Sequence, residues 1–144
     1  MFSWLAKAML KRNMARLREG EYQSVLKLDA KDIRFRFPGD SSWATEIDSR
    51  DDHGRWLQRF VDTGLKLDAD EIIAQGPPWN MTLCVRGTSH LDTEDGRVYE
   101  NRYVMWGHVV WGLLRDYEVY EDTQATKALD EYLSQRESIS VAPT

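Results

Sequence analysis

The feature that most limits the possible folds of this chain is a run of alternating apolar and polar residues from about residue 65 to residue 122. Alternation with a period of two is typical of strands that bury one face. The alternating segments are separated by short groups rich in Gly, Pro and Asp, such as "GPPWN" and "DTEDG". Short connections of this kind join antiparallel neighbours. The second half of the chain is therefore predicted to form one antiparallel sheet.

Helical patterns lie on both sides of this run. Apolar residues recur every three or four positions in segments 1–20, 22–26, 49–64 and 122–135. A further strand is predicted at residues 32–37, and residues 40–48, which have no clear period, are expected to cross the surface. Helices gathered on one side of an antiparallel sheet define the α+β class. Because such a sheet is strongly curved around its helices, we expect an apolar cavity between the two layers.

The length of 144 residues corresponds to one domain. We expect this domain at residues 1–135, followed by a loose tail at 136–144 that has no core-forming pattern. The single cysteine, Cys84, excludes an internal disulfide and a cysteine-rich metal site, and it favours a cytoplasmic location. The histidines have no acidic or thiol neighbours at the spacing of metal ligands, so no metal site is expected.

Charge is distributed unevenly along the chain. The net charge is −5, yet residues 1–18 contain five basic residues and no acidic one, so the remainder carries −10. An acidic body argues against a nucleic-acid partner. The basic start could be the first helix of the domain, which we favour, or a mitochondrial-type presequence, whereas Lys7 interrupts the apolar region that a secretory signal needs. No stretch approaches the ~20 apolar residues of a membrane span, so no membrane partner is expected.

Four local motifs follow one another between residues 4 and 133, namely "DIRFRFPGDSSW", "GPPWN", "DGRVYENRY" and "GLLRDYEVYEDT". In their order and spacing the chain resembles the SnoaL-like branch of the nuclear-transport-factor-2-like (NTF2-like) domains. The resemblance implies a cone-shaped α+β fold with an apolar cavity, and a homodimer that pairs through the sheet. Relatives include polyketide cyclases, epoxide hydrolases, isomerases and non-catalytic domains, so the resemblance does not choose a reaction.

The last two strands decide which side chains reach the cavity. With Trp111 and Gly112 at the turn, Asn101 is expected opposite Asp122. Side chains alternate across a sheet, and the face that this register predicts carries Asn101, Tyr103, Met105, Tyr120 and Asp122. A one-residue slip or a bulge would exchange the two faces.

The resemblance favours this face as the cavity lining. In the epoxide-hydrolase relatives an Arg-x-Asp pair faces a second Asp, and the matching positions here are Asn101, Tyr103 and Asp122. Because Arg and the first Asp are replaced, epoxide hydrolysis is not expected. Asp122 could instead act as a general base, with Tyr103 and Asn101 donating hydrogen bonds to an enolate oxygen. Alternatively, Asp122 caps the helix that begins after it.

Aromatic walls bind flat or apolar ligands without chemistry, and a cationic side chain would suit an anionic one. The residues expected to bind a ligand are Trp43, His53, Trp56, Trp79, Arg86, Met105 and Tyr120. We expect a small apolar or aromatic ligand and no cofactor. Two functions remain open: a ligand-binding domain of unassigned activity, or a cofactor-free enzyme of the cyclase or isomerase kind.

Overall fold

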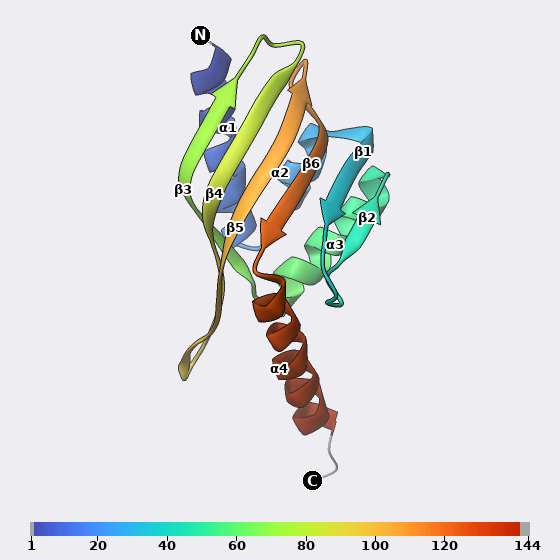
Figure 1. Cartoon of the computed structure of the whole chain (residues 1–144), viewed down its shortest axis with the longest axis vertical. Coiled ribbons are helices and arrows are strands. Elements are labelled where there is room, and N and C mark those ends of the chain that lie inside the picture. Colours follow the sequence, from blue (N-terminus) through green and yellow to red (C-terminus); the bar gives the residue numbers. More distant parts are fainter. Residues whose placement is uncertain (1, 142–144) are drawn as a thin grey trace.

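A computed structural model describes residues 2–141 of the chain. The helices are α1 (Phe2–Arg18), α2 (Gln23–Leu28), α3 (Arg50–Thr63) and α4 (Thr123–Val141). The strands are β1 (Asp29–Phe37), β2 (Thr45–Ile47), β3 (Lys66–Gln75), β4 (Met81–Thr93), β5 (Gly96–Val110) and β6 (Leu113–Glu121), as drawn in Figure 1. The predicted order of elements is confirmed. β2 is a short additional strand within the segment that was expected to cross the surface.

The strands form one curved sheet in the order β2-β1-β6-β5-β4-β3. From β3 to β6 each strand pairs antiparallel with the next, as predicted. β1, however, pairs parallel with β6, so the sheet is mixed. No hairpin sets the direction of β1 against β6, because α3 and four strands separate the two in sequence. The α+β class with a strongly curved, unclosed sheet is confirmed.

The first three helices lie on one side of the sheet, whereas α4 extends away from one end of it (Figure 1). Local signals fix the ends of α3. Ser49 Oγ accepts a hydrogen bond from the backbone N–H of Asp52 at 3.2 Å, and Gly64 adopts a φ of 93° beyond the last turn. Glycine enters this left-handed region without steric cost, and it commonly ends helices there. α4 continues to Val141, so part of the expected tail is helical, and residues 142–144 lie outside the described residues.

The core between the sheet and α3 is aromatic. The ring of Phe35 on β1 lies 4.8 Å from that of Trp56 on α3 and 4.5 Å from that of Tyr117 on β6, measured between centroids. Trp43 packs edge-on against Trp56 and is 2% exposed. Fully burying one large apolar side chain contributes roughly 1.5–3 kcal/mol, so this cluster anchors α3 on the sheet.

A β-bulge in β6 sets which side chains face the helices. Arg115 has no partner in β5, because the residues on either side of it pair with the consecutive residues Val109 and His108. Beyond the bulge every pair is displaced by one position, so Tyr103 lies opposite Glu121 and not opposite the residue before it. The predicted register is therefore wrong beyond the bulge. The side chains of β6 that face inward there are Tyr117, Val119 and Glu121.

Candidate functional site

A cavity of about 260 Å³ lies between the sheet and helices α1–α3. Its lining is almost entirely apolar. The strands contribute Leu67, Met81, Leu83, Val85, Met105, Val109 and Val119, and the helices contribute Leu5, Met9, Leu10, Met14, Trp56 and Phe60. The volume is near the lower end for ligand pockets, which are mostly apolar with few polar groups. The space therefore suits a small, largely apolar molecule.

Glu121 is the one charged residue among the described residues that line this cavity. Ser89 Oγ and Tyr99 OH donate hydrogen bonds to Glu121 Oε2 at 3.0 and 3.3 Å. Both bonds reach the same oxygen, and no donor among residues 2–141 engages Oε1. Burial raises the pKa of Glu121, while the two hydrogen bonds oppose the rise. Glu121 thus lines the cavity with a carboxyl group, one oxygen of which accepts no hydrogen bond from the described residues.

A second set of polar groups meets the cavity at Tyr117. His53 Nε2 lies 2.5 Å from Tyr117 OH, and His53 Nδ1 lies 2.5 Å from Asp29 Oδ2. With Asp29 ionised, Nδ1 donates to the carboxylate and Nε2 accepts from the phenol. The side chains of His53 and Asp29 are fully buried, and Tyr117 is the member that lines the cavity.

Burial is the largest cause of the pKa shifts of Asp29 and Tyr117 in this hydrogen-bonded group. It raises the pKa of Asp29, although His53 opposes the rise, and it raises the pKa of Tyr117 well above its ordinary value. Both shifts disfavour the charged forms. Tyr117 is therefore a neutral hydroxyl whose orientation His53 fixes. It can present a hydrogen-bonding group to a ligand without carrying charge into the cavity.

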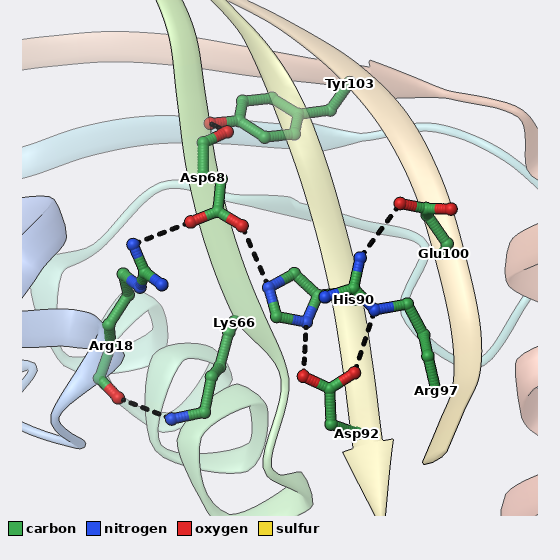
Figure 2. Close-up of polar contacts among 8 residues, drawn as sticks. All are labelled: Arg18, Lys66, Asp68, His90, Asp92, Arg97, Glu100 and Tyr103. Atoms are coloured by element: carbon green, nitrogen blue, oxygen red, sulfur yellow. Dashed lines mark hydrogen bonds and ion pairs between the residues drawn. The ribbon is translucent and has the colours of Figure 1, made fainter.

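Tyr103 also lines the cavity, but its hydroxyl donates to the backbone carbonyl of Asp68 at 3.2 Å (Figure 2). Burial raises the pKa of this phenol as well. The Asp68 carboxylate contacts Arg18 of α1 at 2.7 Å and His90 Nε2 at 2.9 Å, and His90 Nδ1 lies 3.1 Å from Asp92. Figure 2 shows this cluster between β3 and β4. The Arg18–Asp68 contact connects the end of α1 to the sheet, and the Asp68 carbonyl fixes the Tyr103 hydroxyl.

The structure places Asp122 outside the cavity, at the start of α4. Asp122 is exposed, and its Oδ1 accepts from the backbone N–H groups of Gln124 at 3.0 Å and Ala125 at 3.5 Å. It therefore occupies the capping position, which was the alternative interpretation of its sequence context. Asn101 is buried beside it, and its Nδ2 donates to the Asp122 carbonyl at 2.9 Å. Asn101 thus fixes the junction of β6 and α4.

The other residues expected to bind a ligand divide into three groups. Trp56 and Met105 line the cavity, whereas Trp43 and His53 are buried in the layer behind it. Trp79, Arg86 and Tyr120 lie elsewhere.

Each residue outside the cavity has a local reason for its position. Trp79 is 57% exposed in the connection between β3 and β4. Arg86 follows the inward-facing Val85, so it points outward and pairs with Glu71 at 3.0 Å. Tyr120 points outward because the bulge displaces β6 by one residue.

Sequence reasoning missed Glu121, Tyr117 and Asp29. The predicted register placed Glu121 and Tyr117 on the opposite face of β6, and the available signal was a glycine within β5. Gly107 pairs with Tyr117, and a Cβ on it would lie 2.7 Å from Tyr117 Cβ. Glycine within a strand often marks a bulge or a close approach. Asp29 carries no comparable signal, because it lies at the end of a short helix like any surface residue.

The described helices and side chains limit other kinds of site. None of the helices within residues 2–141 has the length and apolar content needed to cross a bilayer. Within the same residues, no group of three or more His, Cys, Asp or Glu side chains is arranged to hold a metal ion.

A curved α+β sheet with helices enclosing an apolar cavity defines a cone-shaped domain. No protein-family model matches the chain, and no curated protein matches it in sequence. Solved structures of the NTF2-like kind match it over most of their length. An NTF2-like protein from Burkholderia xenovorans LB400 has 19% identity and a TM-score of 0.69, covering 89% of this chain and 97% of that one.

Two further structures show the same likeness. Bal32a, from a soil-derived mobile gene cassette, has 13% identity and a TM-score of 0.76, covering 90% of this chain and 99% of its own. TerC, co-crystallised with polyporic acid, has 19% identity and a TM-score of 0.71, covering 86% and 96%. The chain therefore has the NTF2-like fold, as predicted. At these identities the likeness establishes the fold alone.

Proposed function

We propose that this chain is a small-molecule-binding domain, and that its ligand is apolar or aromatic with one hydrogen-bond donor. The observation that carries the proposal is that Glu121 is the single charged residue, among those described, on the lining of a largely apolar cavity. Apolar surface removed from water contributes roughly 25 cal/mol per Å², and a hydrogen bond to a charged group about 1.5–3 kcal/mol. The apolar walls would supply affinity, and Glu121 Oε1 would select a ligand with a hydroxyl or amine.

A structure of the same fold offers a precedent. TerC was co-crystallised with polyporic acid. This supports the expectation that an NTF2-like domain accepts such a ligand. It does not transfer the ligand to this chain, because the shared identity is 19%.

The proposal is tested with 2-naphthol, a flat apolar probe with one hydroxyl. Met105→Trp should abolish binding, because the larger ring would fill the cavity that Met105 lines. Val104→Trp is the matched control, since Val104 is the preceding residue on β5, points outward and is 41% exposed. Binding that survives Met105→Trp, or that is lost equally in both variants, would contradict a ligand in this cavity.

A second candidate function is cofactor-free proton transfer. It is favoured by the presence of two unlike groups on one strand, a carboxyl whose pKa is raised by burial and a neutral phenol oriented by His53. Glu121 and Tyr117 are four residues apart on β6, which corresponds to roughly 13 Å. Glu121 would take a proton at one end of an extended conjugated substrate, and Tyr117 would donate to the oxyanion that develops at the other end. This role requires the proton to reside on Asp29, whose pKa burial raises, so that His53 Nε2–H donates to the phenol oxygen and the phenol proton is free. Loss of turnover in Glu121→Gln with unchanged ligand affinity would distinguish an enzyme from a binding domain.

The outer face of the sheet is proposed to form a homodimer. It exposes four large apolar side chains on three strands, Ile73, Val104, Trp106 and Tyr120. The Arg86–Glu71 ion pair lies among them, and exposed apolar side chains gathered on one face favour burial against a partner. A cytoplasmic location is part of the same proposal, and the single free thiol Cys84 on this sheet is its support.

A further inference from the structure

Three segments without charge meet at one end of the molecule. The start of α1, the connection between β3 and β4, and the turn between β5 and β6 lie together at the end opposite α4 (Figure 1). No charged residue occurs from Gln75 to Val85 or from Val109 to Leu114, and the first charged residue of α1 is Lys7. In a chain with 30% charged residues, such an end is distinctive.

This end carries exposed aromatic rings. Trp4, Trp79 and Trp111 are 65%, 57% and 70% exposed. The ring centroids of Trp79 and Trp111 lie 6.0 Å apart. The backbone N–H of Trp111 donates a hydrogen bond to the backbone carbonyl of Pro78 at 2.8 Å, which joins the two loops. We call these three residues, with Leu5 and Met9 of α1, the tryptophan tip. Exposed apolar patches mark surfaces that meet another phase or partner.

The backbone at Trp111 adds an independent observation. Trp111 has a φ of 52° and Gly112 a φ of 80°, so both central residues of this two-residue turn are left-handed. Asn, Asp or Gly normally occupies such a position, because other side chains are strained there. The ring is 70% exposed and the Trp79 ring beside it is 57% exposed, so burial of the Trp111 side chain does not offset that strain. A strained, exposed tryptophan is better explained by a function outside the folded domain.

The tryptophan tip adjoins the mouth of the cavity. Leu5, Pro78 and Gly112, one from each of the three segments, line the cavity. Leu5 is also 45% exposed, so the cavity reaches the surface beside it. Any ligand that enters here passes the exposed tryptophans.

Basic residues lie directly behind the tip. Lys7, Lys11 and Arg12 follow Trp4 within two to three turns of α1, and none forms an ion pair with the described residues. Tryptophan is the side chain enriched at membrane–water interfaces, where one part of the ring is in apolar surroundings and the N–H is in water. Lysine and arginine near the surface are attracted to anionic lipids.

We propose that the tryptophan tip docks on the surface of a bilayer that contains anionic lipids, and that the cavity exchanges its apolar ligand there. The second half of this inference rests on the proposed function. Docking of this kind is peripheral and needs no spanning helix. It departs from the sequence-based expectation of no membrane partner, which considered only spans.

A second copy of the chain fits this surface less well. Two tips placed together would bring two sets of Lys7, Lys11 and Arg12 near one another, and like charges at an interface oppose association. The outer sheet face already offers a separate surface for a homodimer, with Ile73, Val104, Trp106 and Tyr120 exposed on it. A bilayer complements both the apolar rings and the positive charge.

Co-sedimentation with vesicles tests the proposal. The chain is mixed with vesicles of phosphatidylcholine alone or with about 30% phosphatidylglycerol, which supplies the anionic headgroups. The unmodified chain should bind the anionic vesicles, and added salt should weaken binding. The double variant Trp79→Ser/Trp111→Ser and the charge variant Lys7→Glu/Lys11→Glu should each bind at least about tenfold more weakly.

Val98→Ser is the control, because Val98 is 39% exposed, follows the β4–β5 turn at the other end of the sheet, and belongs neither to the tip nor to the proposed dimer surface. It should bind vesicles like the unmodified chain. Equal loss in the control and the tip variants, or no binding to anionic vesicles at all, would overturn docking by the tip. A monomer–dimer change confined to the tip variants in sedimentation velocity would show a second copy instead and would also overturn it.

Failure of docking and failure of the proposed function are separable. The tip variants should still bind 2-naphthol in solution, since neither Trp79 nor Trp111 belongs to the cavity lining within the described residues. Vesicle binding without any 2-naphthol binding would retain the docking surface and refute the exchange of ligand.

Discussion

Tyr103 on β5 lies directly opposite Glu121 on β6, and both side chains line the cavity. The two differ in what they offer a ligand. The Tyr103 hydroxyl is engaged by the Asp68 carbonyl, whereas Glu121 keeps one carboxyl oxygen free. Glu121 is therefore the group on which the chemistry of the cavity depends.

Replacement of Glu121 should change how stability depends on pH. Burial raises the folded-state pKa of Glu121 above its ordinary value of 4.5. The folded state therefore binds this proton more tightly than the unfolded state does. Its contribution to the free energy of unfolding is complete below the unfolded-state pKa and is lost as pH rises through the folded-state pKa. Glu121→Gln has no carboxyl to ionise, so the variant does not lose this free energy as pH rises. The free energy of unfolding of the variant, relative to the unmodified chain, should therefore increase between about pH 4 and pH 7 in urea titrations. A difference that stays constant or decreases over that range would contradict a buried carboxyl.

Asp122 should matter for the helix and not for the ligand. Asp122→Ala removes the side-chain acceptor at the start of α4, which should lower the free energy of unfolding by about 1 kcal/mol. Asp122→Ser is the control, because serine also caps helices and should restore most of that loss. Both variants should bind 2-naphthol with unchanged affinity. Loss of 2-naphthol binding without a change in the free energy of unfolding would contradict the capping role and would indicate that Asp122 contacts the ligand.

Removal of His53 should be costly. His53→Ala leaves a buried Asp29 carboxyl and the Tyr117 hydroxyl without their partner, so we expect a loss of about 3–5 kcal/mol in urea unfolding. Tyr117→Phe removes a single hydrogen bond and should cost about 1 kcal/mol. His108→Ala is the matched control, because His108 pairs with Asp116 at a 35% exposed site and should change stability by less than about 1 kcal/mol. Equal losses of unfolding free energy in His53→Ala and His108→Ala would contradict buried hydrogen bonds from His53 to Asp29 and Tyr117.

A charge on the outer sheet face should separate the proposed dimer. Trp106→Arg places a cation in the middle of the apolar outer surface, so sedimentation velocity should show a monomer where the unmodified chain is a dimer. Arg102→Lys, at an exposed position that is already charged, should leave the dimer intact. A monomer for the unmodified chain at micromolar concentration would refute this interface.

The element order was predictable because each element carries its own local signal. The α3 caps at Ser49 and Gly64 and the alternation in β3 to β6 act within a few residues. The direction of β1 was not predictable in this way, since its partner β6 is distant in sequence. Pairing at that distance depends on the packing of the whole domain.

The candidate site was harder to predict than the fold, because one residue decides it. The extra residue Arg115 exchanges the two faces of β6, which brings Glu121 inward and leaves Asp122 to cap α4. A strand has a side-chain period of two, so a single bulge reverses every later assignment. Gly107 was a local indication, but its consequence depended on the close approach to Tyr117.

The most direct test compares the affinities of 2-naphthol and naphthalene for the unmodified chain and for Glu121→Gln, by isothermal titration calorimetry. The two probes differ by one hydroxyl, so their difference in affinity isolates the hydrogen bond to the carboxyl, which is worth about 1.5–3 kcal/mol. The account predicts that the unmodified chain prefers 2-naphthol by at least about tenfold, and that Glu121→Gln reduces this preference severalfold while naphthalene binds as before. An equal preference in both proteins, or no binding of either probe, would contradict a cavity whose selectivity comes from Glu121.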